Sequence, residues 1–209
     1  MSQVSENDIH EIVKRVVRLT LGSDSAASAP IQQEKTPLST PVTTGSDPVK
    51  DVPAQRVVAI GTDHGGVEMK KILIKDLTEM GYNVFDCGTN STEPVDYPDI
   101  AYAVALLVAQ GKAWRGVILD GAGIGSCMAA NKVQGIRAAL CYDYATAVNS
   151  REHNDANVLT LGAGLIGNNL ARQILKTWLA TEFGGGRHAN RVDKIMEIET
   201  KPYNDGMRK

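Results

Sequence analysis

Short β-rich runs alternate with longer amphipathic stretches from residue 56 onward. The runs expected to form strands cover residues 56–61, 82–86, 116–120, 136–141 and 158–162. The stretches with helical periodicity cover residues 67–80, 99–110, 126–133, 144–151, 168–183 and 189–199. Strands that alternate with helices in this way are typical of a parallel sheet with helices on both faces. The pattern therefore predicts that residues 56–209 form a three-layer αβα, Rossmann-like α/β domain with a five-stranded parallel sheet.

A separate hydrophobic stripe lies near the start of the chain. Its members recur at the spacing of one helix face, and they are Ile9, Ile12, Val13, Val16 and Val17. Ser5 and Asp8 match a capping box, which satisfies free N–H groups at a helix start. Because so short a helix is marginal on its own in water, its apolar stripe needs a surface on which to dock. Residues 1–21 are therefore expected to hold an amphipathic docking helix.

The stretch between these two parts, residues 22–55, is rich in Ser, Thr, Ala and Pro and contains no aromatic residue. Such a composition buries too little apolar surface to offset the entropy lost on ordering. We expect residues 22–55 to be a disordered, fairly extended linker.

Composition and charge narrow the class of protein further. The formal net charge of −2 gives no reason to expect a nucleic-acid binder. No apolar run is long enough to span a bilayer, and no signal peptide is recognisable, so a soluble cytoplasmic protein is expected. The three cysteines, Cys87, Cys127 and Cys141, lack the spacing of a zinc site or a disulfide framework and suit small buried positions.

Two turns stand where ligands bind in such sheets, outside the carboxyl ends of the strands. Residues 61–66 follow the first expected strand, and residues 120–126 follow the third. The second turn is rich in glycine and opens onto a helix, where free N–H groups and the helix dipole can hold an anion. Its spacing matches neither the dinucleotide fingerprint nor the P-loop.

Several short motifs gain weight because they occur together and in order. They are Asp63-His64, Asp96-Tyr97-Pro98, the turn at 121–125 with Ala129-Ala130-Asn131-Lys132, His153-Asn154, and Gly185-Gly186-Arg187-His188 with Arg191. Over residues 57–199 this set resembles the family of ribose-5-phosphate isomerase B and galactose-6-phosphate isomerase. The resemblance implies an aldose–ketose isomerase of phosphorylated sugars, with ribose 5-phosphate and ribulose 5-phosphate as the leading substrate pair.

That reaction needs an acid for the ring oxygen, a base at C2, donors for an ene-diolate oxyanion and a phosphate clamp, but no metal or organic cofactor. The resemblance implies that His153 opens the ring and that His64, Arg187 and Arg191 hold the phosphate. It assigns the oxyanion to backbone N–H groups of Gly121, Ala122, Gly123, Ile124 and Gly125. It adds Asp63, Tyr97, Asn131, Asn154 and His188 as further substrate contacts. It also implies a homodimer, or a dimer of dimers, in which two subunits share each site.

The chain departs from this family at the expected base. Isomerase B enzymes place a cysteine directly after the third strand, where this chain has Asp120. Asp120 is either the base itself, with a pKa raised at a dry strand end, or a structural carboxylate that caps the glycine turn. Cys127 is the second candidate, because the helix dipole would lower its thiol pKa, and Ser126 ranks last.

Two more departures bear on the substrate. Ala122 replaces a hydroxyl residue, and Gly164 stands where isomerase B enzymes usually carry a phosphate-binding arginine. The alternatives are therefore an isomerase of another pentose or hexose phosphate, or a non-catalytic sugar-phosphate-binding subunit that needs a cysteine-bearing partner.

The leading helix and its linker resemble the encapsulation peptides that direct enzymes into bacterial microcompartments. This resemblance predicts that residues 5–21 dock on a shell protein and that the enzyme resides inside a microcompartment. Packing on the chain's own domain, self-association and membrane-surface binding are the alternatives.

Overall fold

The computed structural model describes residues 56–201. The docking helix predicted within residues 1–21 and the linker predicted at residues 22–55 lie outside the described residues, so both stay predictions. No helix in the part of the chain that is described is long and apolar enough to cross a membrane.

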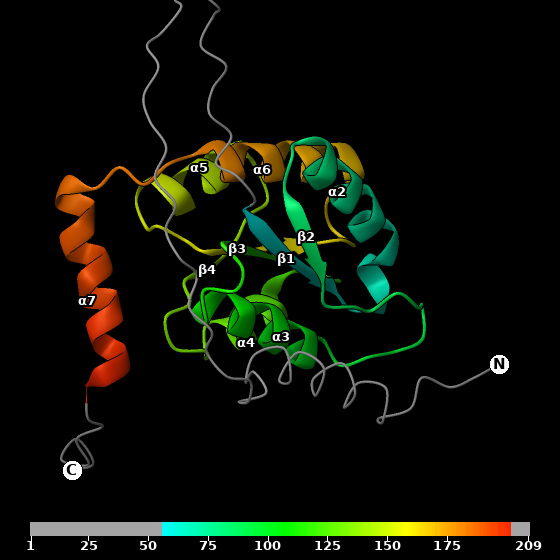
Figure 1. The fold of residues 1–209 in the computed structure, drawn as a ribbon, viewed down its shortest axis with the longest axis horizontal. Helices are drawn as coiled ribbons and strands as arrows, with labels where there is room; N and C mark the ends of the chain where they lie inside the picture. Colours follow the sequence, from blue (N-terminus) through cyan, green and yellow to red (C-terminus); the bar gives the residue numbers. More distant parts are fainter. Residues whose placement is uncertain (1–55, 202–209) are drawn as a thin grey trace, which may run out of the picture.

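Five parallel strands form one sheet at the centre of the domain (Figure 1). They are β1 (Val57–Thr62), β2 (Asn83–Asp86), β3 (Arg115–Asp120), β4 (Ala138–Leu140) and β5 (Val158–Gly162). Their order across the sheet is β2-β1-β3-β5-β4, and every neighbouring pair is parallel. β3 is buried along its whole length, as a central strand covered on both faces must be. The predicted five-stranded parallel sheet is confirmed.

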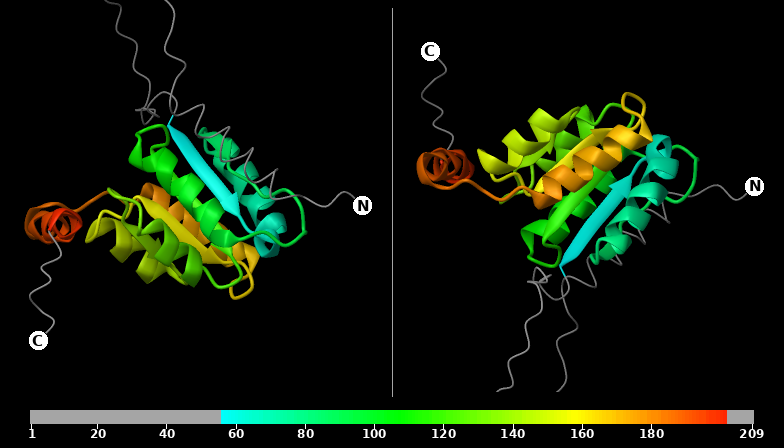
Figure 2. Two further views of the ribbon diagram at one scale, coloured as in Figure 1. Left: turned by 90° about the horizontal axis from the view of Figure 1, so that it is seen from below. Right: turned by 90° about the horizontal axis from the view of Figure 1, so that it is seen from above.

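Helices cover both faces of this sheet (Figures 1 and 2). One face carries α2 (Val67–Glu79), α5 (Tyr144–Glu152) and α6 (Asn168–Ala180). The other face carries α3 (Tyr97–Ala109) and α4 (Ile124–Ala130). Each helical layer encloses its own hydrophobic cluster against the sheet. The three-layer αβα architecture predicted from the sequence is therefore confirmed.

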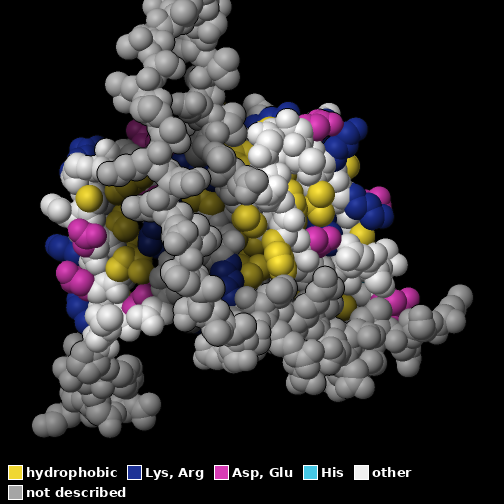
Figure 3. Space-filling view, viewed as in Figure 1, with side chains coloured by type: hydrophobic (Ala, Val, Ile, Leu, Met, Phe, Trp, Pro, Cys, Tyr) yellow, Lys and Arg dark blue, Asp and Glu magenta, His cyan; other side chains and the backbone are white. Residues whose placement is uncertain are grey.

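The last helix, α7 (Ala189–Thr200), stands apart from these layers as an arm (Figures 1 and 2). It follows a single 3-10 turn, η2 (Gly186–His188), and a similar turn, η1 (His64–Gly66), follows β1. Ile195 and Ile198 on α7 are 44% and 66% exposed. Hydrophobic side chains line the side of α7 nearer the body, and charged ones line its outer side (Figure 3). This arm therefore presents an apolar side that the described part of its own chain does not fully cover.

Four predicted helix boundaries were wrong by two or three residues. α3 begins at Tyr97 rather than 99, and α4 ends at Ala130 rather than 133. α4 begins at Ile124, two residues early, because Gly123 adopts a left-handed conformation (φ 77°) directly before it. α6 ends at Ala180 rather than 183, because Thr181 is extended and its carbonyl accepts a hydrogen bond from Arg151 Nε. Neither the conformation of Gly123 nor the contact of Thr181 is visible in a hydrophobic pattern.

An ion pair joins α2 and α6 and gives a testable contribution to stability. Arg172 donates from Nε and Nη2 to the two carboxylate oxygens of Asp76, at 2.6 and 2.7 Å, and Asp76 is only 2% exposed. These hydrogen bonds hold the pKa of Asp76 below its ordinary value. The stabilisation is therefore fully present above the unfolded-state pKa and is lost as the pH falls through the lower folded-state pKa.

We expect Asp76→Asn to lower the free energy of unfolding by about 2 kcal/mol at pH 7. Urea titrations at pH 7 and at pH 3 measure the effect, and the difference from wild type should shrink at the lower pH. Glu68→Gln is the control, because its pair with Lys71 is exposed on both sides and should be worth less than about 0.5 kcal/mol. An unchanged stability of Asp76→Asn at pH 7 would contradict the expectation.

Candidate active site

The turn after β1 places Asp63 and His64 at the carboxyl end of the sheet. The Asp63 N–H donates to Leu119 O of β3 at 3.2 Å, and Asp63 Oδ1 accepts from Gly65 N at 2.9 Å. Asp63 is therefore fixed between two strands and is 8% exposed. His64 is exposed, and its Nδ1 accepts a long hydrogen bond of 3.5 Å from Val95 N. Its other ring nitrogen is thus available to a ligand.

The carboxylate of Asp120 organises the glycine-rich turn after β3. Its Oδ1 accepts from the N–H groups of Ala122, at 2.8 Å, and Gly123, and its Oδ2 accepts from Ser126 N at 2.9 Å. Asp120 is 4% exposed. These contacts are those of a cap, the second of the two roles considered for this residue.

The cap changes which N–H groups can serve an oxyanion. Those of Ala122 and Gly123 donate to Asp120, so two of the five predicted donors are occupied. The N–H groups of Ile124 and Gly125 are the first two of α4 and have no acceptor inside the helix. With Gly121, they are the donors that remain for a ligand.

The ring of Tyr97 lies directly against this turn. A Cβ atom at Gly125 would come within 2.5 Å of the end of the Tyr97 ring, so any larger residue there would displace the tyrosine. From the other side, the hydroxyl of Tyr142 donates to Ala122 O at 2.8 Å. Tyr97 was predicted as a substrate contact, whereas no motif pointed to Tyr142. The turn is therefore held between two tyrosines.

Cys127 is less suited to proton transfer than its position in the first turn of a helix indicated. Its Sγ lies 3.4 Å from Ala138 O and 3.6 Å from Asn131 Nδ2. Burial raises the pKa of the Cys127 thiol. The expectation of a lowered pKa was wrong, because loss of hydration outweighs the hydrogen bonds that favour the thiolate.

A second group of predicted residues gathers around the end of α5 and η2. The rings of His153 and His188 stack with 4.2 Å between centroids and 6° between planes. Burial, and then the nearby His153, Arg187 and Arg191, hold the pKa of His188 below its ordinary value. Arg187 and Arg191 are exposed and have no hydrogen-bond or ion-pair partner among residues 56–201. They are free cations beside two imidazoles, an arrangement that suits a phosphate.

The two groups lie at opposite ends of the sheet in one chain. Asp63, His64 and the turn at 121–125 follow the carboxyl ends of β1 and β3. His153 lies at the end of α5, which returns to the amino end of the sheet before β5 begins. The five residues of β5 alone separate these ends by roughly 15 Å. One chain therefore does not bring His153 together with His64.

Two other positions have local partners. The side-chain amide of Asn131, predicted to bind substrate, donates to Ala138 O at 2.9 Å and accepts from Ala138 N at 2.8 Å. It thus joins the end of α4 to the edge strand β4. Gly164 N donates to Gly121 O at 2.9 Å, so the position of the missing arginine does border the glycine turn.

Sequence reasoning missed Asn149, whose Nδ2 lies 2.8 Å from His153 Nδ1. The spacing of four residues on an expected helix was the available signal, since such residues are neighbours on a helix face.

Comparison with known proteins places this geometry in a family. Residues 58–195 match the family model described as "Ribose/Galactose Isomerase". Ribose-5-phosphate isomerase B of Escherichia coli is 44% identical over 144 residues, which are 69% of this chain and 97% of that protein. D-erythrulose-4-phosphate isomerase of Pectobacterium atrosepticum is 44% identical over 66% of this chain and 91% of that protein. The structure of Clostridium thermocellum ribose-5-phosphate isomerase B has a TM-score of 0.68 at 51% identity, covering 69% of this chain and 97% of the other.

Proposed function

The chain belongs to the ribose/galactose isomerase family and is an aldose–ketose isomerase of phosphorylated sugars, and from this we propose that it interconverts ribose 5-phosphate and ribulose 5-phosphate through an ene-diolate. The observation that carries the proposal is a pair of cations, Arg187 and Arg191, which have no ion-pair or hydrogen-bond partner within residues 56–201 and lie beside the two stacked imidazoles. The names of the E. coli and C. thermocellum relatives support the choice of sugar.

We infer that two copies of the chain share each site. His64 and the glycine turn of one protomer would face His153, Arg187 and Arg191 of the other. Two features support this. The two groups are separated by the length of the sheet in one chain, and α7 lies outside the three layers with exposed Ile195 and Ile198. A groove lined by Ala138, Leu140, Ala145, Asn149 and Ile195 runs beside β4 and α5 and offers an apolar surface for a second copy.

In the shared site each group has one task. His64, Arg187 and Arg191 hold the phosphate, and His153 acts on the ring oxygen as the sugar opens. A base then takes the C2 proton, and the proton returns at C1, while N–H groups of the glycine turn stabilise the ene-diolate oxygen. Asp63 and Tyr97 border that turn and suit the sugar hydroxyls. Asn154 and His188 complete the second half of the site.

The identity of the base decides between this function and a second candidate. Three backbone N–H groups already occupy the Asp120 carboxylate, and burial disfavours the Cys127 thiolate. These two observations favour a second candidate function, that of a subunit that needs a cysteine-bearing partner for turnover.

Purified homomer assayed with pentose and hexose phosphates separates the candidates. We expect the highest kcat/KM with ribose 5-phosphate. Faster turnover of a hexose 6-phosphate would show that the substrate is a hexose phosphate rather than ribose 5-phosphate. A chain that binds ribose 5-phosphate by calorimetry but turns over no sugar would establish the partner-dependent subunit.

We further propose that residues 5–21 direct the enzyme to the shell of a bacterial microcompartment. Deleting residues 1–55 should leave kcat and KM unchanged and abolish co-purification with shells. In the full chain, Ile12→Glu with Val16→Glu should have the same effect, because both lie on the apolar stripe, whereas Lys14→Glu on the opposite face is the matched control. Shell association that survives the deletion would refute the proposal.

A further inference from the structure

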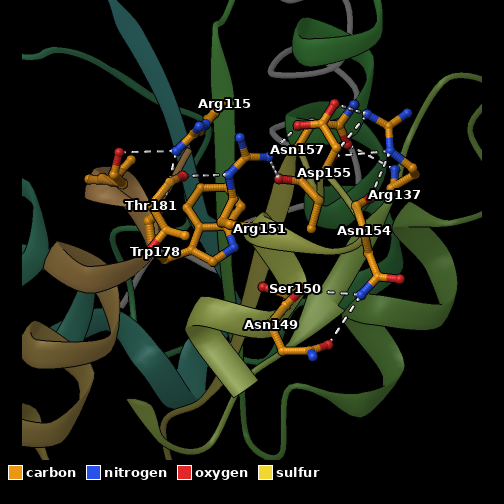
Figure 4. Close-up of polar contacts among 12 residues, drawn as sticks. Arg115, Arg137, Asn149, Ser150, Arg151, Asn154, Asp155, Asn157, Trp178 and Thr181 are labelled. Carbon is orange, nitrogen blue, oxygen red and sulfur yellow. Dashed lines mark hydrogen bonds and ion pairs between the residues drawn. The ribbon is translucent and has the colours of Figure 1, made fainter. Parts of the chain in front are cut away.

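A short chain of hydrogen bonds fixes the side chains around His153. Asn154 Nδ2 lies 3.2 Å from the backbone carbonyl oxygen of Asn149 and 3.2 Å from the side-chain oxygen of the same residue. The other end of the Asn149 amide, Nδ2, lies 2.8 Å from His153 Nδ1. Figure 4 shows the Asn149–Asn154 part of this chain.

The direction of each bond follows from one fixed acceptor. A backbone carbonyl oxygen can only accept, so the Asn154 atom that faces it must be the amide nitrogen. That nitrogen also faces the Asn149 side chain, whose nearer atom must then be the oxygen. The Asn149 nitrogen is left to donate to His153 Nδ1. Because Nδ1 accepts, the single proton of a neutral ring sits on Nε2.

The loop after His153 is held firmly enough to keep this direction. Asp155 adopts a left-handed conformation (φ 47°), which is uncommon outside glycine. Its carboxylate accepts from Arg151 Nη1 at 2.7 Å and from Arg137 Nη2 at 3.0 Å, and Arg137 Nε also donates to Asn154 O at 3.2 Å (Figure 4). Arg137 thus holds Asn154 directly, and both arginines hold the next residue, Asp155.

The stacked ring of His188 restrains His153 in a second way. Parallel rings 4.2 Å apart oppose rotation of the His153 plane. A half-turn of the ring would replace Nδ1 by a carbon atom and break the bond from Asn149.

We propose that Asn149 is a positioning residue that holds His153 as the neutral tautomer with its proton on Nε2. The inference rests on the proposed ring-opening role of His153 and specifies its chemistry. His153 donates a hydrogen bond to the ring oxygen rather than acting as an imidazolium acid. The net step moves the anomeric hydroxyl proton to the ring oxygen through water as the bond between C1 and the ring oxygen breaks, so the imidazole supplies no net proton.

Nitrogen-15 NMR of the labelled full chain tests the tautomer directly. Only four histidines are present, at positions 10, 64, 153 and 188, and His153→Gln identifies the signals of interest. We expect one protonated nitrogen, Nε2, at pH 7.5. Asn149→Asp should reverse the tautomer, because a carboxylate can only accept and would do so from Nδ1–H. Asn83→Asp makes the same change on the exposed start of β2 and should leave the tautomer of His153 unaltered.

Kinetics supply a readout that a purely structural role would not move. Ribulose 5-phosphate is open-chain, because its 5-hydroxyl is esterified, so exchange of its C1 proton with solvent through the ene-diolate needs no ring step. Asn149→Asp should therefore lower kcat/KM about tenfold in both directions, as the fixed equilibrium requires, and leave the rate of deuterium exchange into C1 of ribulose 5-phosphate nearly unchanged. An equal loss of that exchange would overturn the inference.

The two hypotheses fail in different ways. A wild-type His153 protonated on Nδ1, or on both nitrogens at pH 7.5, would overturn the role of Asn149 even in an active isomerase. A chain inert with every sugar would overturn the proposed function, while the tautomer and its reversal in Asn149→Asp would still be measured.

Discussion

Mixing two inactive variants, His64→Ala and His153→Ala, should restore about a quarter of wild-type activity if two copies of the chain share each site. Each substitution removes one half of the site, and the two halves lie at opposite ends of the sheet. Random reassociation makes half of the dimers mixed. One of the two sites in each mixed dimer then receives both intact halves, and the other receives neither.

The experiment requires subunit exchange, by co-expression with two affinity tags or by joint refolding, followed by assay of ribose 5-phosphate turnover. His153→Ala mixed with Arg187→Ala is the matched control, because both residues belong to the same half and no mixed dimer regains a complete site. Mixed dimers that form but stay inactive would show that the site is not divided in this way. We expect activity to recover because the rigid strands of the sheet keep His64 and His153 of one chain apart, so a complete site needs both chains.

The sequence was sufficient to predict the layers of the domain and the elements that carry the motifs. The alternation of β-rich and amphipathic runs specified the five strands and six helices because each element buries a face whose periodicity is local. The same pattern also located His64 and Asp120 at strand ends. These features depend on the residues within single segments, so one sequence is enough to predict them.

The contacts between segments could not be read in this way. Nothing local to Asp120 indicates that its carboxylate faces the N–H groups of Ala122 and Ser126 rather than a ligand. The position of Cys127 in the first turn of a helix predicts a lowered thiol pKa, yet the burial that raises this pKa comes from α4 packing on β4. The separation of His153 from His64 likewise depends on the direction in which α5 returns across the sheet, which is a property of the topology.

The largest loss from a single substitution is expected for Asp120→Asn. The amide keeps one oxygen acceptor but turns an NH₂ group toward an N–H donor of the turn, on Ser126 or on Gly123. Because the site is buried, two donors then face each other without water, and we expect the free energy of unfolding to fall by about 2–4 kcal/mol. Turnover should fall as well, since the N–H groups of Ile124 and Gly125 lose their fixed positions.

The free energy of unfolding distinguishes the two roles of Asp120, because a base and a cap both predict that Asp120→Asn loses turnover. If Asp120 were a base and not a cap, Asp120→Asn would unfold with a free energy within about 0.5 kcal/mol of wild type, and its kcat would fall by about 10²–10⁴-fold. Urea titration beside steady-state kinetics measures both quantities. Ser126→Ala is the control in the same turn: it keeps the backbone N–H that donates to Asp120 and removes a buried hydroxyl without a hydrogen-bond partner. Because an unpaired buried hydroxyl costs free energy, Ser126→Ala should not lower the free energy of unfolding, so a loss of stability in Asp120→Asn comes from the carboxylate.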